Sequence, residues 1–197
     1  MEQFGRTRTP NSAVDFVDIL KVRHAILMAE RPDKQPGVLK RKSNRAGSTI
    51  FVGPDYVEGT LMQGYELYRT LPSGLARGMY IHFLVAECHP FDDGNGRIAR
   101  LMMNAELVAD DAHKIIVPTV HRESYLNGMR QASQKGRFRA IVNVLHQLQV
   151  YTASIRWSDY GEAREALENH GATMEPDEGV PIFNRVLKEF GGHYLPG

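Results

Sequence analysis

The residues best suited to chemistry lie in one short stretch, residues 89–100, which reads HPFDDGNGRIAR. It holds one histidine, two adjacent aspartates, an asparagine between two glycines, and two arginines. The segments on either side, 75–88 and 101–108, are rich in apolar residues and lack proline, which predicts helices. We therefore expect a loop that joins two helices and runs into the start of the second.

The glycines of this stretch favour phosphate binding. A helix N-terminus offers unpaired backbone N–H groups and a partial positive charge. Gly94 and Gly96 would let the backbone approach an anion closely, and Asn95 tolerates unusual dihedral angles between them. Arg97 and Arg100, three residues apart on the first helical turn, can add charge-assisted hydrogen bonds to phosphate oxygens.

Two side chains beside the glycines supply other groups that a reaction at phosphate needs. Asp93 can give an oxygen ligand to a hard divalent cation that bridges phosphates. His89 can accept a proton near neutral pH without any perturbation of its pKa. Each feature alone is also common in ordinary loops, so it is the combination that indicates a functional site.

The stretch resembles the signature of Fic proteins, His-x-Phe-x-(Asp/Glu)-Gly-Asn-Gly-Arg-x-x-Arg, at every fixed position. This resemblance implies Mg²⁺-dependent transfer of AMP from ATP to a Ser, Thr or Tyr hydroxyl of a target protein. It makes His89 the general base and Asp93 the Mg²⁺ ligand. Residues 94–96 would form the anion hole, and Arg97 and Arg100 would bind the phosphate tail.

Three further positions of the signature have implied roles. Phe91 is expected to point into the core, and Asp92 is expected to be exposed and not catalytic. A Doc-like branch of the family, which resembles a kinase, has lysine where this chain has Gly96. The glycine favours AMP transfer.

Residues 48–52, which read STIFV before Gly-Pro, predict a short strand or half of a hairpin. In Fic proteins a β-hairpin flap upstream of the signature clamps the target by strand addition, which registers a peptide through its backbone. The resemblance makes Thr49, Ile50 and Phe51 candidates for target docking. An edge strand that serves only packing is the alternative.

Two residues after the signature helix are candidates through the resemblance. Tyr125 lies where Fic proteins usually place an aromatic wall for adenine, although a core tyrosine would show the same pattern. Many Fic proteins inhibit themselves through a helix with (Ser/Thr)-x-x-x-Glu-(Gly/Asn), whose glutamate pairs with the arginine equivalent to Arg100. Ser158 and Glu162 have this spacing, but Ala163 follows, so Glu162 is an inhibitory candidate on an incomplete motif. Otherwise inhibition comes from an antitoxin-like partner, from an absent N-terminal segment, or not at all.

Composition sets the remaining bounds. With 197 residues, 42% of them hydrophobic and 24% charged, the chain is long enough for a globular core. A net charge of +1 gives no overall attraction to nucleic acid or membranes, and the cluster Lys40–Arg45 is expected to be a solvated face or a rim that attracts ATP. The lone Cys88, expected to be buried, and the lack of a signal peptide or membrane span predict a cytoplasmic protein.

The predicted fold is mainly α, a Fic-type helical bundle with a small β-hairpin flap. We expect one compact domain that consists of an N-terminal helical lead-in (1–37), a Fic core (38–155) and a C-terminal helical extension (156–197). The oligomeric state and the nucleotide preference stay open. Rival functions are another Fic-type nucleotidyl or phosphoryl transfer, removal of AMP, or a nucleotide-binding interaction module without turnover.

Overall fold

The computed structural model describes residues 9–47 and 49–190, and it divides into two compact units, Met1–Ala112 and His113–Gly197. Both units are helical, and a two-stranded antiparallel sheet is the only sheet in these ranges. This confirms a mainly α fold with a small hairpin. None of the helices within the described ranges is long and apolar enough to cross a membrane. The expected division at residues 37 and 155 does not coincide with the boundary between the units and stays a prediction; residues 1–8 and 191–197 lie outside the description.

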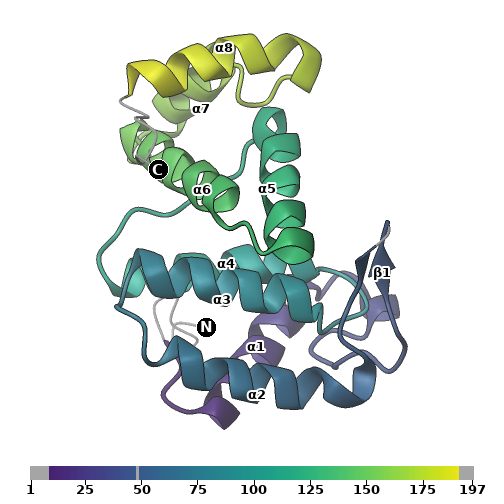
Figure 1. Cartoon of the computed structure of the whole chain (residues 1–197). Helices are drawn as coiled ribbons and strands as arrows, with labels where there is room; N and C mark the ends of the chain where they lie inside the picture. Colours follow the sequence, from purple (N-terminus) through teal and green to yellow (C-terminus); the bar gives the residue numbers. More distant parts are fainter. Residues whose placement is uncertain (1–8, 48, 191–197) are drawn as a thin grey trace. The chain divides into compact units, whose positions relative to one another are not determined.

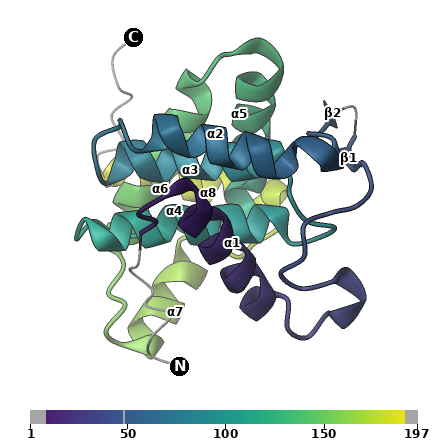
Figure 2. The same cartoon turned by 90° about the horizontal axis from the view of Figure 1, so that it is seen from below.

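The first unit contains four helices, α1 (Ala13–Leu27), α2 (Val57–Tyr68), α3 (Leu75–Cys88) and α4 (Asn95–Ala109). Helices α3 and α4 run side by side and are joined by the signature loop, 89–94 (Figure 1). Helix α2 packs on α3, and α1 packs on both α2 and α4 (Figure 2). The predicted arrangement of a loop between two helices is therefore present.

Helix α1 and the core beneath the loop follow from local sequence. Ser12 caps α1 by accepting a hydrogen bond from the Asp15 N–H at 3.1 Å, which satisfies one of the free donors at a helix start. The apolar faces of the four helices then meet in one core. Its fully buried members include Leu20, Leu61, Val85, Ile98 and Met102.

The hairpin precedes α2 and consists of β1 (Arg45–Ala46) and β2 (Thr49–Ile50), paired as Arg45 with Ile50 and Ala46 with Thr49. The 3-10 turns η1 (Pro32–Lys34) and η2 (Pro54–Tyr56) lie before and after it. We call the two strands β1 and β2 together the flap. It lies at the end of the first unit where α3 finishes and α4 begins (Figure 1).

The second unit contains η3 (Thr119–His121), α5 (Arg122–Lys135), α6 (Arg139–Ser154), α7 (Tyr160–Asn169) and α8 (Pro176–Glu189). Helices α5 and α6 form a packed pair, and α8 packs on η3. The aromatic core of this unit consists of Tyr151, whose ring centroid lies 4.7 Å from that of Phe183, and the neighbouring rings of His121 and His170.

Candidate active site

The signature loop leaves α3 through a residue in the left-handed region. His89 is the C-cap of α3, with φ 49° and ψ 58°, and its N–H donates to the Val85 carbonyl at 3.0 Å. A non-glycine residue in this conformation costs of order 1–3 kcal/mol and persists only where its surroundings hold it. The contacts around His89 are therefore part of the site.

The His89 imidazole is held in a form that can act as a base. Nδ1 lies 3.1 Å from the Ala86 carbonyl oxygen, which can only accept, so Nδ1 carries the proton and Nε2 keeps its lone pair. Burial lowers the pKa of His89, and the charge of Lys40 lowers it further, against the opposing effects of the Ala86 hydrogen bond and Asp93. The ring is thus neutral near neutral pH, with Nε2 available.

Helix α4 begins at a glycine that no other residue could replace without strain. Gly94 is the N-cap, with φ 75°, and its N–H donates to Asp93 Oδ1 at 2.6 Å. A Cβ at this position would lie 2.8 Å from Met28 Sδ and 3.3 Å from His24 Nε2. Residues 95–97 lie in the first turn of α4. Their N–H groups have no carbonyl of the helix before them to which they could donate a hydrogen bond. The predicted helix start is therefore present, and anion binding there stays a prediction.

The Asn95 side chain points into the loop, a contact that the sequence did not indicate. It is buried, its Oδ1 accepts from the Phe91 N–H at 2.9 Å, and its Nδ2 donates to the Phe91 carbonyl at 2.8 Å. The side chain therefore stabilises the loop from inside, and only the backbone N–H of Asn95 is placed to bind phosphate. Phe91 itself is fully buried, and Asp92 is exposed, as expected.

The charged side chains of the loop lie at the start of α4. Arg97 is exposed, and its guanidinium lies 3.7 Å from Asp93 Oδ2. Arg100 lies one turn further, with one guanidinium nitrogen 3.4 Å from the position that a Cβ on Gly96 would take. The loop and the first two turns of α4 thus place one carboxylate and two guanidinium groups at the same helix start as the glycines.

Asp93 fits a cation that arrives with phosphates. One of its carboxylate oxygens accepts the Gly94 N–H, and the carboxylate is partly exposed beside Arg97. Mg²⁺ commonly takes one or two carboxylates and completes its shell with phosphate oxygens and water. Within residues 9–47 and 49–190, there is no group of three or more His, Cys, Asp or Glu side chains that could hold a metal ion.

His24 of α1 supports the loop from below and was not predicted. The Gly37 N–H donates to its Nδ1 at 2.9 Å, so Nε2 carries the proton and donates to the Asp93 carbonyl at 3.0 Å. Its ring stacks on Phe91, with centroids 3.6 Å apart and planes within 1°. Burial lowers its pKa, which keeps this neutral form. A histidine in an apolar helical stripe reads as a core residue, so the sequence offers no signal for this role.

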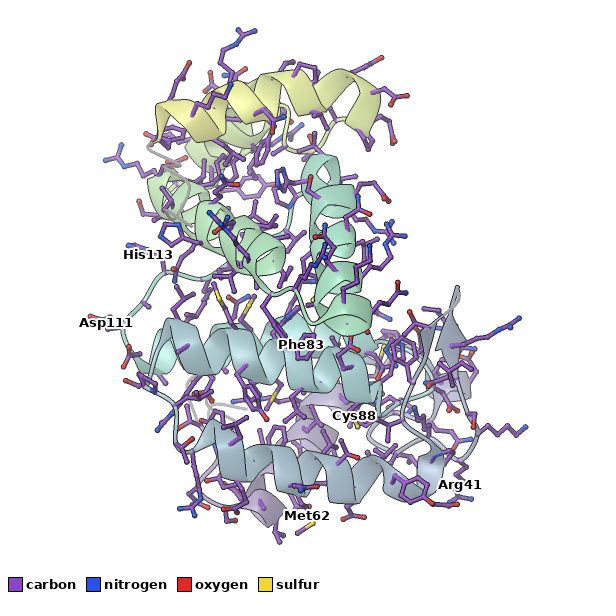
Figure 3. The ribbon with its side chains drawn as sticks, viewed as in Figure 1. Arg41, Met62, Phe83, Cys88, Asp111 and His113 are labelled. Carbon is purple, nitrogen blue, oxygen red and sulfur yellow. The ribbon has the colours of Figure 1, made fainter. Side chains whose placement is uncertain are left out.

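Lys40 and Asn44 support the loop from the flap side, and the prediction of a solvated face is wrong for Lys40. Its side chain is buried, and Nζ donates to Asn44 Oδ1 at 2.6 Å and to the Cys88 carbonyl at 3.3 Å. Asn44 Nδ2 donates to the carbonyl oxygens of His89 and Phe91, at 3.2 and 3.1 Å. Cys88 is buried at the end of α3, as expected, whereas the remaining cations of the cluster are exposed. Figure 3 labels Cys88 and one of these cations, Arg41.

The three flap candidates have different surroundings. Ile50 is 80% exposed in β2, and its neighbour Thr49 is partly buried. Phe51, the first residue after β2, stacks its ring on the His89 imidazole, with centroids 3.8 Å apart and planes within 6°. Target docking by these residues stays a prediction, and the contact between Phe51 and His89 was not anticipated.

Tyr125 and Glu162 belong to the other compact unit, and their roles toward the loop stay predictions. Tyr125 is buried in α5. Glu162 is exposed in the first turn of α7, where its carboxylate pairs with Arg156 at 3.0 Å and its N–H donates to Asp159 Oδ1 at 2.9 Å. In this structure the Glu162 carboxylate is therefore engaged within its own unit.

The first unit thus contains a helical pair whose connecting loop carries a histidine and a carboxylate and runs into an open helix start, with a hairpin beside it. Residues 14–107 match the family model described as Fic/DOC. A Fido domain-containing protein of Dictyostelium discoideum is 31% identical over 109 residues, which cover 51% of this chain and 76% of that protein. The chain belongs to the Fic/DOC family.

Two other similarities bear on fold and length. A protein of Aedes aegypti named "Protein adenylyltransferase Fic" is 25% identical over 184 residues, which are 91% of this chain and 36% of that protein. The solved structure of Fic-1 from C. elegans matches with a TM-score of 0.58 and 24% identity, covering 68% of this chain and 40% of that chain. The chain thus spans about a third of the length of the Aedes protein.

Proposed function

We propose that this protein is an adenylyltransferase that moves AMP from ATP to a Ser, Thr or Tyr hydroxyl of a target protein. The observation that carries the proposal is the hydrogen bond from His89 Nδ1 to Ala86, because it leaves Nε2 as a base in the same loop as an anion-binding helix start. Relatives that carry the name protein adenylyltransferase support this assignment.

In the proposed reaction His89 Nε2 takes the proton of the target hydroxyl. The hydroxyl oxygen then forms a bond to the α-phosphorus of ATP, the bond from that phosphorus to the oxygen bridging to the β-phosphate breaks, and pyrophosphate leaves. The products are AMP-modified protein, pyrophosphate, and a proton held by His89 until it passes to solvent. Asp93 would hold Mg²⁺, which when bound offsets the negative charge of the phosphates.

The start of α4 would bind the phosphates during this step. The N–H groups of residues 95–97 and the positive end of the helix dipole favour an anion there. Arg97 and Arg100 lie on the same two turns and add positive charge for the phosphate tail. Because the helix fixes the N–H groups of residues 95–97 before ATP arrives, these groups need little reorganisation in the transition state.

The test is to incubate the purified protein and a lysate with Mg²⁺ and ATP labelled either at the α- or at the γ-phosphate. Label from the α-position alone, lost in His89→Ala, would support AMP transfer. Label from the γ-position would mean phosphoryl transfer despite Gly96, and binding of ATP without any label would favour an interaction module. A parallel series with labelled GTP, CTP and UTP identifies the preferred nucleotide.

The pH dependence of transfer should report the His89 imidazole. Only the neutral ring can accept a proton, and its fraction falls as the pH drops through the pKa. Because burial lowers that pKa from its ordinary value of 6.5, the acid limb of kcat/KM is expected to have its midpoint below pH 6.5. The measurement is the initial rate of α-label transfer at limiting ATP across about pH 5 to 8. An acid limb centred above pH 6.5 would contradict this prediction.

A further inference from the structure

Both ends of the flap contact the residue assigned as the base. Asn44 immediately precedes β1, and Phe51 immediately follows β2. The Phe51 N–H donates to the Asn44 carbonyl at 3.3 Å, so these two residues close the base of the flap. Each of them also contacts His89, one through a hydrogen bond and the other through its ring.

The first contact is a set of hydrogen bonds along the backbone of the loop. Four consecutive carbonyl oxygens, those of residues 88–91, each accept a hydrogen bond from Lys40 or Asn44. Lys40 donates from Nζ to the Cys88 carbonyl at 3.3 Å and from its backbone N–H to the Pro90 carbonyl at 2.8 Å. Asn44 donates from Nδ2 to the carbonyl oxygens of His89 and Phe91. These bonds span the left-handed turn at His89, which needs such support to persist.

The second contact is the stack of Phe51 on the imidazole. Nearly parallel planes with centroids 3.8 Å apart cover one face of the His89 ring and fix the plane in which it lies. The hydrogen bond to Ala86 fixes the rotation of the ring within that plane. Together the two contacts determine where Nε2 points. An aliphatic side chain could fill the same space beside His89, but it could not hold the plane of the imidazole by stacking.

We infer that Phe51, Asn44 and Lys40 are positioning residues that join the flap and His89 into one rigid unit. The inference rests on the proposed function and deepens it. A target segment that pairs with β2 engages the strand that Phe51 directly follows, so docking of the target and orientation of the base are coupled through one residue. The target hydroxyl therefore meets a base whose direction is set by the same strand that binds the target.

The test compares Phe51→Leu with Phe51→Tyr, which keeps a flat ring of similar size. A matched control is Tyr56→Leu, which makes the same kind of change at an exposed aromatic residue near the flap. Phe51→Leu is expected to lower the apparent kcat of α-label transfer roughly 10- to 100-fold, as displaced catalytic groups do, with the KM for ATP unchanged. Phe51→Tyr should retain most of the rate, and Tyr56→Leu should match the wild type.

An NMR measurement without turnover separates this inference from the proposed reaction. The ring current of Phe51 should shift the Hε1 resonance of His89, identified by its loss in His89→Asn. That shift should disappear in Phe51→Leu and remain in Phe51→Tyr. If the wild type transfers no AMP but the resonance responds in this way, the reaction is wrong and the positioning role stands.

A second variant tests the backbone contacts while keeping the partner of Lys40. Asn44→Asp retains an oxygen for Lys40 Nζ but lacks the two N–H groups that reach the loop carbonyls. We expect a lower kcat, an altered His89 resonance and an unchanged helical circular dichroism spectrum. The inference is overturned if Phe51→Leu leaves kcat and the resonance at wild-type values. It is also overturned if the loss of rate is only a higher KM for the target, because Phe51 would then act on docking alone.

Discussion

Replacing His89 with alanine is expected to reduce AMP transfer by at least about 10²- to 10⁴-fold while ATP still binds, because a general base acts only in the chemical step. The helix start and the arginines that would hold the phosphates belong to α4 and are not altered by this change. The measurements are α-label incorporation into target protein and the dissociation constant for ATP by calorimetry. Transfer at the original rate in this variant would rule out the proposed mechanism.

His89 sits at φ 49°, so alanine at this position adds backbone strain that could disturb the loop for reasons unrelated to catalysis. His89→Asn removes the imidazole but tolerates the left-handed conformation, and it should lose transfer to the same extent. His113→Ala is the matched control, because that histidine is exposed and lies outside residues 89–100 in the sequence. It should keep the full rate.

Replacing Phe91 with alanine is expected to lower the free energy of unfolding by roughly 3–5 kcal/mol and to weaken ATP binding as well. The Phe91 side chain is 0% exposed and stacks on His24, so its loss leaves a cavity directly under the loop. Its backbone N–H and carbonyl are bonded by Asn95, and the carbonyl is bonded by Asn44 too, so relaxation into the cavity would pull on the start of α4.

Urea unfolding and ATP titration of the same preparation check both parts of this prediction. Phe138→Ala is the matched control: the same atoms are deleted from a side chain that is 46% exposed, and the expected cost is correspondingly smaller. Equal losses in the two variants would show that Phe91 does not anchor the loop. A large loss of stability in Phe91→Ala with unchanged affinity for ATP would show that Phe91 stabilises the core but does not position the start of α4 for phosphate binding.

The parts of the site that the sequence predicted are those encoded by neighbouring residues. The signature places the base, the carboxylate and the glycines within a single loop, and the apolar runs on either side predict the helices α3 and α4. The β-branched and aromatic residues 48–52, next to glycine, predict a short strand or half of a hairpin, and the family resemblance implies the hairpin flap. The burial of Phe91 and the exposure of Asp92 followed from the family resemblance. Each of these features depends on spacing along the chain.

The sequence alone therefore determined which chemical groups the loop offers, and the tertiary structure decided what holds them. His24 lies 69 residues before Asp93, and Asn44 lies 45 residues before His89, so no local pattern links either pair. The inward turn of Asn95, the burial of Lys40 and the stack of Phe51 on His89 likewise depend on neighbours that packing brings together. A hydrogen bond or a stack forms only when two segments meet at the right distance and angle, and that meeting is a property of the folded core.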